Sequence, residues 1–185
     1  MRRTLAFALL AASLGCASST APSRTPAVHV SSGHGYALLY AILDQERQVS
    51  KLLLIKVERD DLETIIDAIA ETSGQAHERL EALAEADPGL NLTDTGLPLE
   101  EVRTRLAIAA TRQEQLLAAS GPELELQLLL TQNEALTYMA HLADTLSRSE
   151  PDPARLAFVR EFWKEVTLLR EDVMSLARRP GPTGG

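Results

Sequence analysis

Apolar residues recur at steps of three and four along most of the chain, which is the spacing of one face of an α-helix. The pattern predicts four helices of similar length, over residues 35–58, 61–86, 121–147 and 153–178. No segment shows the strict alternation of apolar and polar residues that is typical of a β-strand. We therefore expect an all-α fold.

Polar residues precede three of these helices where a helix start requires them. Asp60 and Ser120 are each followed three residues later by a glutamate, as in a capping box. Asp152 precedes Pro153, and proline suits the first position of a helix because no N–H is needed there. These residues predict caps at Asp60, Ser120 and Asp152.

The connection over residues 87–119 opens as a loop at 90–97, and residues 98–117 then return to helical spacing. A helix of about 20 residues spans roughly 30 Å, so this segment is long enough to run the length of a bundle. Short connections make the first two helices antiparallel, and likewise the last two. We predict a four-helix bundle with a long helical crossover between helices two and three. Helices one and four then begin at the same end, which gathers these aromatic residues there: Tyr36, Tyr40, Phe158, Phe162 and Trp163.

The amino terminus has the layout of a secretion signal. Arg2 and Arg3 precede an apolar run at residues 5–14, which is followed by Gly15 and Cys16. The run is too short to span a bilayer, which needs about 20 apolar residues. It resembles a bacterial lipoprotein signal, which implies cleavage before Cys16 and lipidation of its thiol. An ordinary secretion signal cut near Ala17 and an uncleaved anchor are the alternatives.

Composition divides the chain into four parts. Residues 1–15 form the signal peptide, and 16–33 form the lipidated cysteine and a tether rich in Ser, Thr, Ala and Pro. Residues 34–178 form the helical bundle, and 179–185 a disordered tail. His29 and His34, which we assign to the tether, are too sparse for a metal-binding tract.

Charge excludes some classes of partner. The net charge is −8, and removal of the two positive charges of Arg2 and Arg3 with the signal changes it to −10. Nucleic acid and anionic membrane surfaces attract basic proteins, so neither is an expected partner. Cys16 is the single cysteine, which excludes an internal disulfide.

Two antiparallel pairs joined by a long crossover match the ferritin-like arrangement. Three stretches, at 69–84, 128–135 and 152–158, resemble a family of small exported bacterial ferritin-like bundles of unknown function. Ferritin-like metal enzymes use inward glutamates with two Glu-x-x-His pairs, and this chain contains no such pair. That family tends to place inward histidines on its second, third and fourth helices. This chain has other residues there, so we expect that no inherited metal site remains: Thr72 or Ser73, Leu136, and Glu171 or Asp172.

A few polar residues lie on or near apolar faces. We place Glu46 at the edge of the core, because an isolated buried carboxylate is costly; a polar core pair and a metal ligand are the alternatives. His77 is interpreted as a hydrogen-bonded histidine bordering the core, with a ligand role as the alternative. Glu134, Tyr138 and His141 share one face of their helix, and we predict a solvated surface trio, with a partner-binding or metal patch as the alternative.

No catalytic motif appears, so an enzyme is not expected, nor is a cofactor. The favoured hypothesis is a non-enzymatic envelope lipoprotein with a structural or protein-binding role, lipid-anchored at the outer membrane and facing the periplasm. The membrane, through the lipid, and other envelope proteins are its expected partners. One alternative is a ferritin-like metal-binding or oxidase protein whose rearranged site uses Glu46 or His77. Another is a carrier of a small apolar ligand, with an open cavity beside the leucine-rich helix at 121–147.

Overall fold

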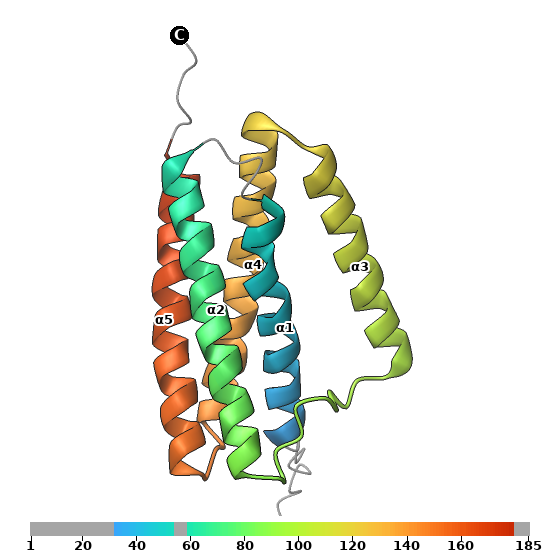
Figure 1. Ribbon diagram of the computed structural model, residues 1–185, viewed down its shortest axis with the longest axis vertical. Helices are drawn as coiled ribbons and strands as arrows, with labels where there is room; N and C mark the ends of the chain where they lie inside the picture. Colours follow the sequence, from blue (N-terminus) through green and yellow to red (C-terminus); the bar gives the residue numbers. More distant parts are fainter. Residues whose placement is uncertain (1–31, 54–58, 180–185) are drawn as a thin grey trace, which may run out of the picture.

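The computed structural model describes residues 32–53 and 59–179. This part of the chain is helical and contains no β-strand (Figure 1). Its five helices are α1 (Ser32–Leu53), α2 (Asp60–Ala86), α3 (Leu99–Ala118), α4 (Gly121–Ser147) and α5 (Pro153–Ala177). The prediction of an all-α fold is confirmed.

The helix boundaries follow the apolar pattern closely. α4 has the predicted bounds, α2 and α5 differ from prediction by one residue at one end, and α3 is shifted by one residue at both ends. α1 begins at Ser32, three residues before the predicted start, so this helix includes His34. The predicted signal peptide, Cys16 and His29 lie outside the described residues, as do 54–58 and most of the predicted tail.

The core lies between α1, α2, α4 and α5. The closest packing is between α4 and α5 and between α1 and α2, and α2–α5 and α1–α4 contacts complete the enclosure. Helices that pack against each other run in opposite directions, and α1 and α5 begin at the same end, as predicted (Figure 1). The largest fully buried apolar side chains come from all four helices: Tyr36, Leu39, Leu43, Leu62, Ile69, Leu80, Leu124, Leu128, Leu136, Met139, Phe158 and Phe162. Each such side chain contributes about 1.5–3 kcal/mol by leaving water.

The aromatic residues predicted to gather at this end differ in their burial. Tyr36, Phe158 and Phe162 belong to the core and Tyr40 packs against it, but Trp163 is 41% exposed. Phe162 and Val166 are one turn apart and face inward together. Trp163 follows Phe162 by 100° around the helix and therefore points away from the core.

Of the three predicted caps, one makes its hydrogen bond. The Asp152 side chain accepts from the backbone N–H of Arg155 at 2.8 Å. Ser120 occupies the N-cap position of α4 without a side-chain cap hydrogen bond. The prediction of a cap at Asp60 is wrong, because Arg59 occupies the N-cap position and Asp60 is the first residue of α2. The acidic side chains of that first turn still favour the helix through its dipole.

α3 differs from the other helices. It packs mainly against α4, and none of its residues, all of which are described, is buried. It runs beside the other four helices along much of their length, as predicted, and carries the chain from the end of α2 to the start of α4 (Figure 1).

Both connections to α3 are packed against the core. Leu90 is buried in the segment before α3, and Ala119 directly after it. Gly96 has φ of +64°, and a Cβ there would collide with the imidazole of His34 in α1. His34 also lies 3.6 Å from the Asp94 carboxylate. The α2–α3 connection therefore rests on the first turn of α1.

Within the described ranges, no helix is both long enough and apolar enough to cross a membrane.

Candidate functional site

Five polar or charged residues of the described chain are buried: Glu46, Ser73, His77, Gln132 and Glu150. Burying a polar group costs free energy unless it is hydrogen-bonded, so each of these residues marks a special arrangement. Four of them form three separate groups, at one end of the helices, between α1 and α2, and between α1 and α4.

The first group surrounds Glu150 in the turn between α4 and α5. Its carboxylate accepts from the Tyr36 hydroxyl at 2.7 Å and from the Asp152 backbone N–H at 2.9 Å. The Arg155 guanidinium contacts it at 3.0 and 3.1 Å and also binds Asp87, just beyond α2. The group thus joins α1, the end of α2, and the α4–α5 turn.

The pKa values in this group are consistent with a structural role. Burial acts to raise the pKa of Glu150, but hydrogen bonds from Arg155, the Asp152 backbone and Tyr36 outweigh it, and the net pKa lies below its ordinary value. Burial and the bond to Glu150 raise the pKa of Tyr36 well above its usual range. Glu150 is therefore a charged acceptor at neutral pH, and Tyr36 is a neutral donor.

The second group contains His77 of α2. Its ring stacks on Tyr40 with centroids 4.2 Å apart, and its nitrogens lie 3.8 Å from Asp44 and Glu81 carboxylate oxygens. The Tyr40 hydroxyl donates to Glu81 at 2.8 Å. Because 3.8 Å exceeds hydrogen-bond distance, His77 is held by stacking and burial, and the predicted hydrogen bond is not formed.

The third group is the pair of Glu46 on α1 and Gln132 on α4. Glu46 is 7% exposed and Gln132 1%, so the predicted position of Glu46 at the edge of the core is wrong. The alternative of a polar core pair describes it, because the Gln132 side chain hydrogen-bonds to the Glu46 carboxyl. The cost of burying an isolated carboxylate suggested an edge, but Gln132 of α4 supplies a partner inside the core.

Two residues of the predicted solvated trio on α4 contact α3. Arg112 contacts both Glu134 oxygens at 2.7 and 2.8 Å, and the Glu134 side chain is still 63% exposed. The Arg105 guanidinium lies 5.9 Å from the centre of the Tyr138 ring. Glu134 and His141 are exposed as predicted, whereas Tyr138 is half-buried beside α3.

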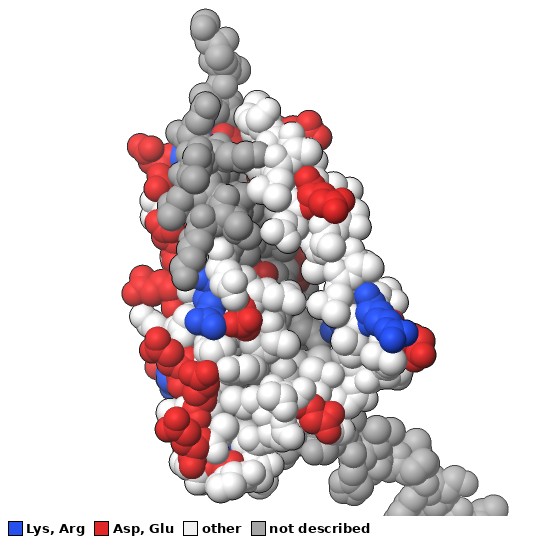
Figure 2. Space-filling model, turned by 45° about the vertical axis from the view of Figure 1, so that its right-hand side comes forward, with Lys and Arg blue, Asp and Glu red and all other residues white. Residues whose placement is uncertain are grey.

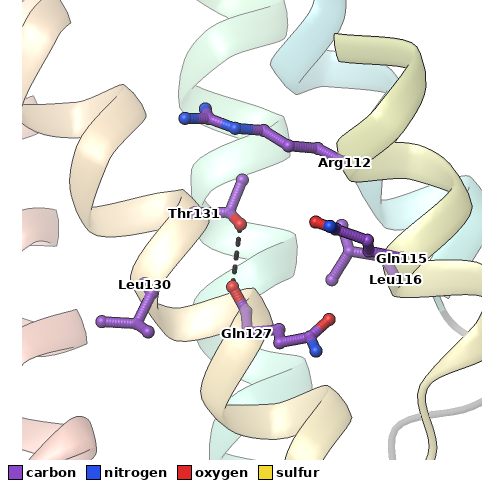
Figure 3. Close-up of a pocket in the computed structure, with 6 residues that line it drawn as sticks. All are labelled: Arg112, Gln115, Leu116, Gln127, Leu130 and Thr131. Carbon is purple, nitrogen blue, oxygen red and sulfur yellow. Dashed lines mark hydrogen bonds between the residues drawn. The ribbon is translucent and has the colours of Figure 1, made fainter. Parts of the chain in front are cut away.

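A cavity of about 170 Å³ lies between α3 and α4 (Figure 3). It is open to solvent, and within it the Thr131 hydroxyl donates to the Gln127 backbone carbonyl at 2.8 Å. Six residues line it: Arg112, Gln115, Leu116, Gln127, Leu130 and Thr131. Ligand pockets usually measure about 300–1,000 Å³, so this cavity is too small to be more than a weak candidate site.

The positions compared with ferritin-like metal sites do not converge. Ser73 and Leu136 are buried, Thr72 is half-buried, and Glu171 and Asp172 are exposed. In the part of the chain that the structure describes, no group of three or more His, Cys, Asp or Glu side chains could hold a metal ion.

No protein-family model, curated protein or solved structure matches the chain. A function for this chain is therefore inferred from its own residues and their contacts. Sequence reasoning missed Gln132, Glu150 and Arg155. Glu150 and Arg155 flank the predicted Asp152 cap, and a charged pair beside a tight turn was the available signal. Gln132 had no such sequence signal, because a single amide among leucines does not indicate which residue it contacts.

Proposed function

We propose that the chain is a non-enzymatic lipoprotein of the bacterial envelope, anchored through Cys16, with a structural or protein-binding role. The lipid would hold it at the outer membrane, facing the periplasm, where other envelope proteins are its partners. The observation that carries the binding role is the exposed apolar surface of α3 and of the adjoining side of α4.

Large apolar side chains on these two helices remain in contact with solvent. Leu99, Leu106 and Ile108 of α3 are 47–60% exposed, and Leu126 and Leu130 of α4 are 53% and 59% exposed. The side that carries α3 is turned forward in Figure 2, and uncharged atoms cover most of it. Single exposed leucines are common, but a concentration of them on neighbouring helices is typical of a surface that binds another protein.

We further propose that the fold is a ferritin-like four-helix bundle in which α3 is the crossover. The enclosure of the core by α1, α2, α4 and α5, and the position of α3 outside it, support this assignment. The buried polar group around Glu150 supports a structural role for these residues, because Tyr36, Glu150 and Arg155 bind one another.

A photo-crosslinking residue at Leu106 tests the protein-binding role. Leu168 on α5 is the matched control, because it is also a leucine and its exposure of 62% is close to the 60% of Leu106. In intact cells that produce the protein, we expect discrete crosslinked products from position 106 and none from position 168. Equal crosslinking from both positions, or none from position 106, would contradict a binding role for α3.

The anchor is tested separately by Cys16→Ser. We expect the variant to leave the membrane fraction and appear with soluble proteins after cell disruption. Retention in the membrane fraction would show that the lipid on Cys16 is not the anchor.

The two alternative functions gain less support. A rearranged metal site would need more donors than the pairs around Glu46 and His77 supply among the described residues. An apolar-ligand carrier would need a larger cavity than the one between α3 and α4. Stoichiometric iron or manganese that survives dialysis of the purified protein would nevertheless overturn the non-enzymatic proposal.

A further inference from the structure

The Glu46–Gln132 pair contains two buried oxygen atoms that lack a hydrogen-bond partner. They are Oε2 of Glu46, on α1, and Oε1 of Gln132, on α4. Both side chains are more than nine-tenths buried, and they hydrogen-bond to each other. Unsatisfied buried polar atoms are rare in folded proteins because each costs about 1–3 kcal/mol, so two in one contacting pair require an explanation.

The chemistry of the two atoms identifies what is missing. An ionised carboxylate has only acceptors, and an amide oxygen is also an acceptor, so Oε2 and Oε1 cannot bond to each other. One proton on Glu46 converts its carboxyl into a donor. The protonated carboxyl can then donate to Gln132 Oε1 while the Gln132 amide nitrogen donates to the other Glu46 oxygen.

We propose that the Glu46–Gln132 pair is a proton-binding site, in which one proton taken up on folding completes the hydrogen bonding between α1 and α4 and makes their packing sensitive to pH. The proton satisfies both orphan oxygens at once. It also removes a negative charge from the core. Among the described residues, no basic side chain neutralises that charge.

The charged groups on the surrounding elements have other partners. On α1, Arg47 binds Asp44 at 2.6 Å. On α2, His77 lies against Tyr40, Asp44 and Glu81.

Charged groups on the remaining elements either bind other partners or lie at the surface. On α4, Glu125 binds Arg59 at 3.1 Å and Glu134 binds Arg112 of α3 at 2.7 Å. Most titratable side chains in the middle of α5 are exposed, and Arg170 is half-buried: Lys164, Glu165, Arg170, Glu171 and Asp172. Among the described residues, the ionisation of Glu46 responds to burial and to the hydrogen bond from Gln132.

The direction of the pH effect follows from these two causes. Burial raises the pKa of Glu46 and the hydrogen bond from Gln132 lowers it by less, so that the pKa rises from 4.5 to about 7. Between these values the folded chain keeps the proton and the unfolded chain releases it. The contribution of Glu46 to folding stability is therefore greatest below the unfolded pKa, falls as the pH rises towards about 7, and changes no further above it.

The test compares the full chain with its Glu46→Gln variant in denaturant titrations at pH 5 and pH 8. Glutamine has the shape and hydrogen-bonding capacity of a protonated glutamate, so the variant should keep the pair intact at both pH values. We expect the unfolding equilibrium constant of the natural chain to rise roughly 70-fold more than that of the variant between pH 5 and 8. Glu134→Gln, which removes an exposed carboxylate from the same helix as Gln132, should respond to pH as the natural chain does.

An equal pH response in the natural chain and in Glu46→Gln would overturn the proposal. Carbon-13 NMR of the Glu46 carboxyl in the natural chain tests the same point without any variant. A titration midpoint near 7 supports the proton site. A midpoint at or below 4.5 would overturn it and would indicate that a bound cation or bridging water satisfies the two oxygens instead.

Discussion

α3 and α4 are neighbours in sequence and in space, but they owe their helical structure to different causes. α4 places nine residues in the interior, whereas α3 places none there. α3 is rich in alanine, arginine, glutamate and glutamine, which favour a helix through backbone propensity. In most protein helices, packing of an apolar face contributes more to helix stability than propensity does. Helical spacing in a sequence therefore indicates a helix without establishing that the helix is part of the core.

The largest difference between the two helices should appear on truncation of a leucine. Leu136 of α4 is fully buried, so Leu136→Ala should lower the free energy of unfolding by about 2–5 kcal/mol. Leu106 of α3 is 60% exposed, so Leu106→Ala should change it by less than about 0.5 kcal/mol. Urea titrations followed by circular dichroism measure both. Similar losses for the two variants would show that α3 belongs to the cooperative core.

Loss of a buried ion pair should likewise lower the free energy of unfolding more than loss of a surface ion pair. The difference should be smaller than for the two leucines. Arg155→Ala leaves Glu150, whose side chain is fully buried, without its main charged partner and should cost about 1–3 kcal/mol. Arg148→Ala is the control, because Arg148 is 75% exposed and binds Asp144 one turn away. Its loss should cost no more than about 0.5 kcal/mol. Thermal and urea unfolding of the two variants measure the difference, and an equal cost would contradict the structural role of Glu150.

The weakest effect is expected at the contact between α3 and α4. Backbone amides of α3 should exchange with solvent faster than those of α4, because exchange follows local opening where few apolar contacts are buried. Arg112→Ala removes the contact with Glu134 and should speed exchange in α3 several-fold, while the free energy of global unfolding changes by less than about 0.5 kcal/mol. Hydrogen exchange followed by NMR measures both helices in one sample. Equal protection of α3 and α4 would contradict the separation drawn between them.

The sequence allowed prediction of the helices because their signals are local. The apolar spacing of α4 and the Asp152–Pro153 start of α5 lie within one or two turns of the positions they determine. Asp60 was misjudged because the backbone can begin a helix one residue earlier, with Asp60 as its first residue.

The buried polar groups were harder to predict because their partners lie far apart in the chain. Tyr36 and Glu150 are separated by 114 residues, so no local pattern pairs them. Glu46 was placed at an edge because an isolated buried carboxylate is costly, and its partner Gln132 lies on another helix. The contact of Glu134 and Tyr138 with α3 depends on how the crossover packs, which helical spacing does not specify.

The two connections of α3 hold that helix in place. The absence of a side chain at Gly96 lets its first end lie against His34 of α1, and the buried Ala119 holds its second end beside the core. Gly121, with φ of +56°, makes the turn that follows. Because the anchors of α3 lie in its connections, its own exposed positions are open to substitution without a cost to the core.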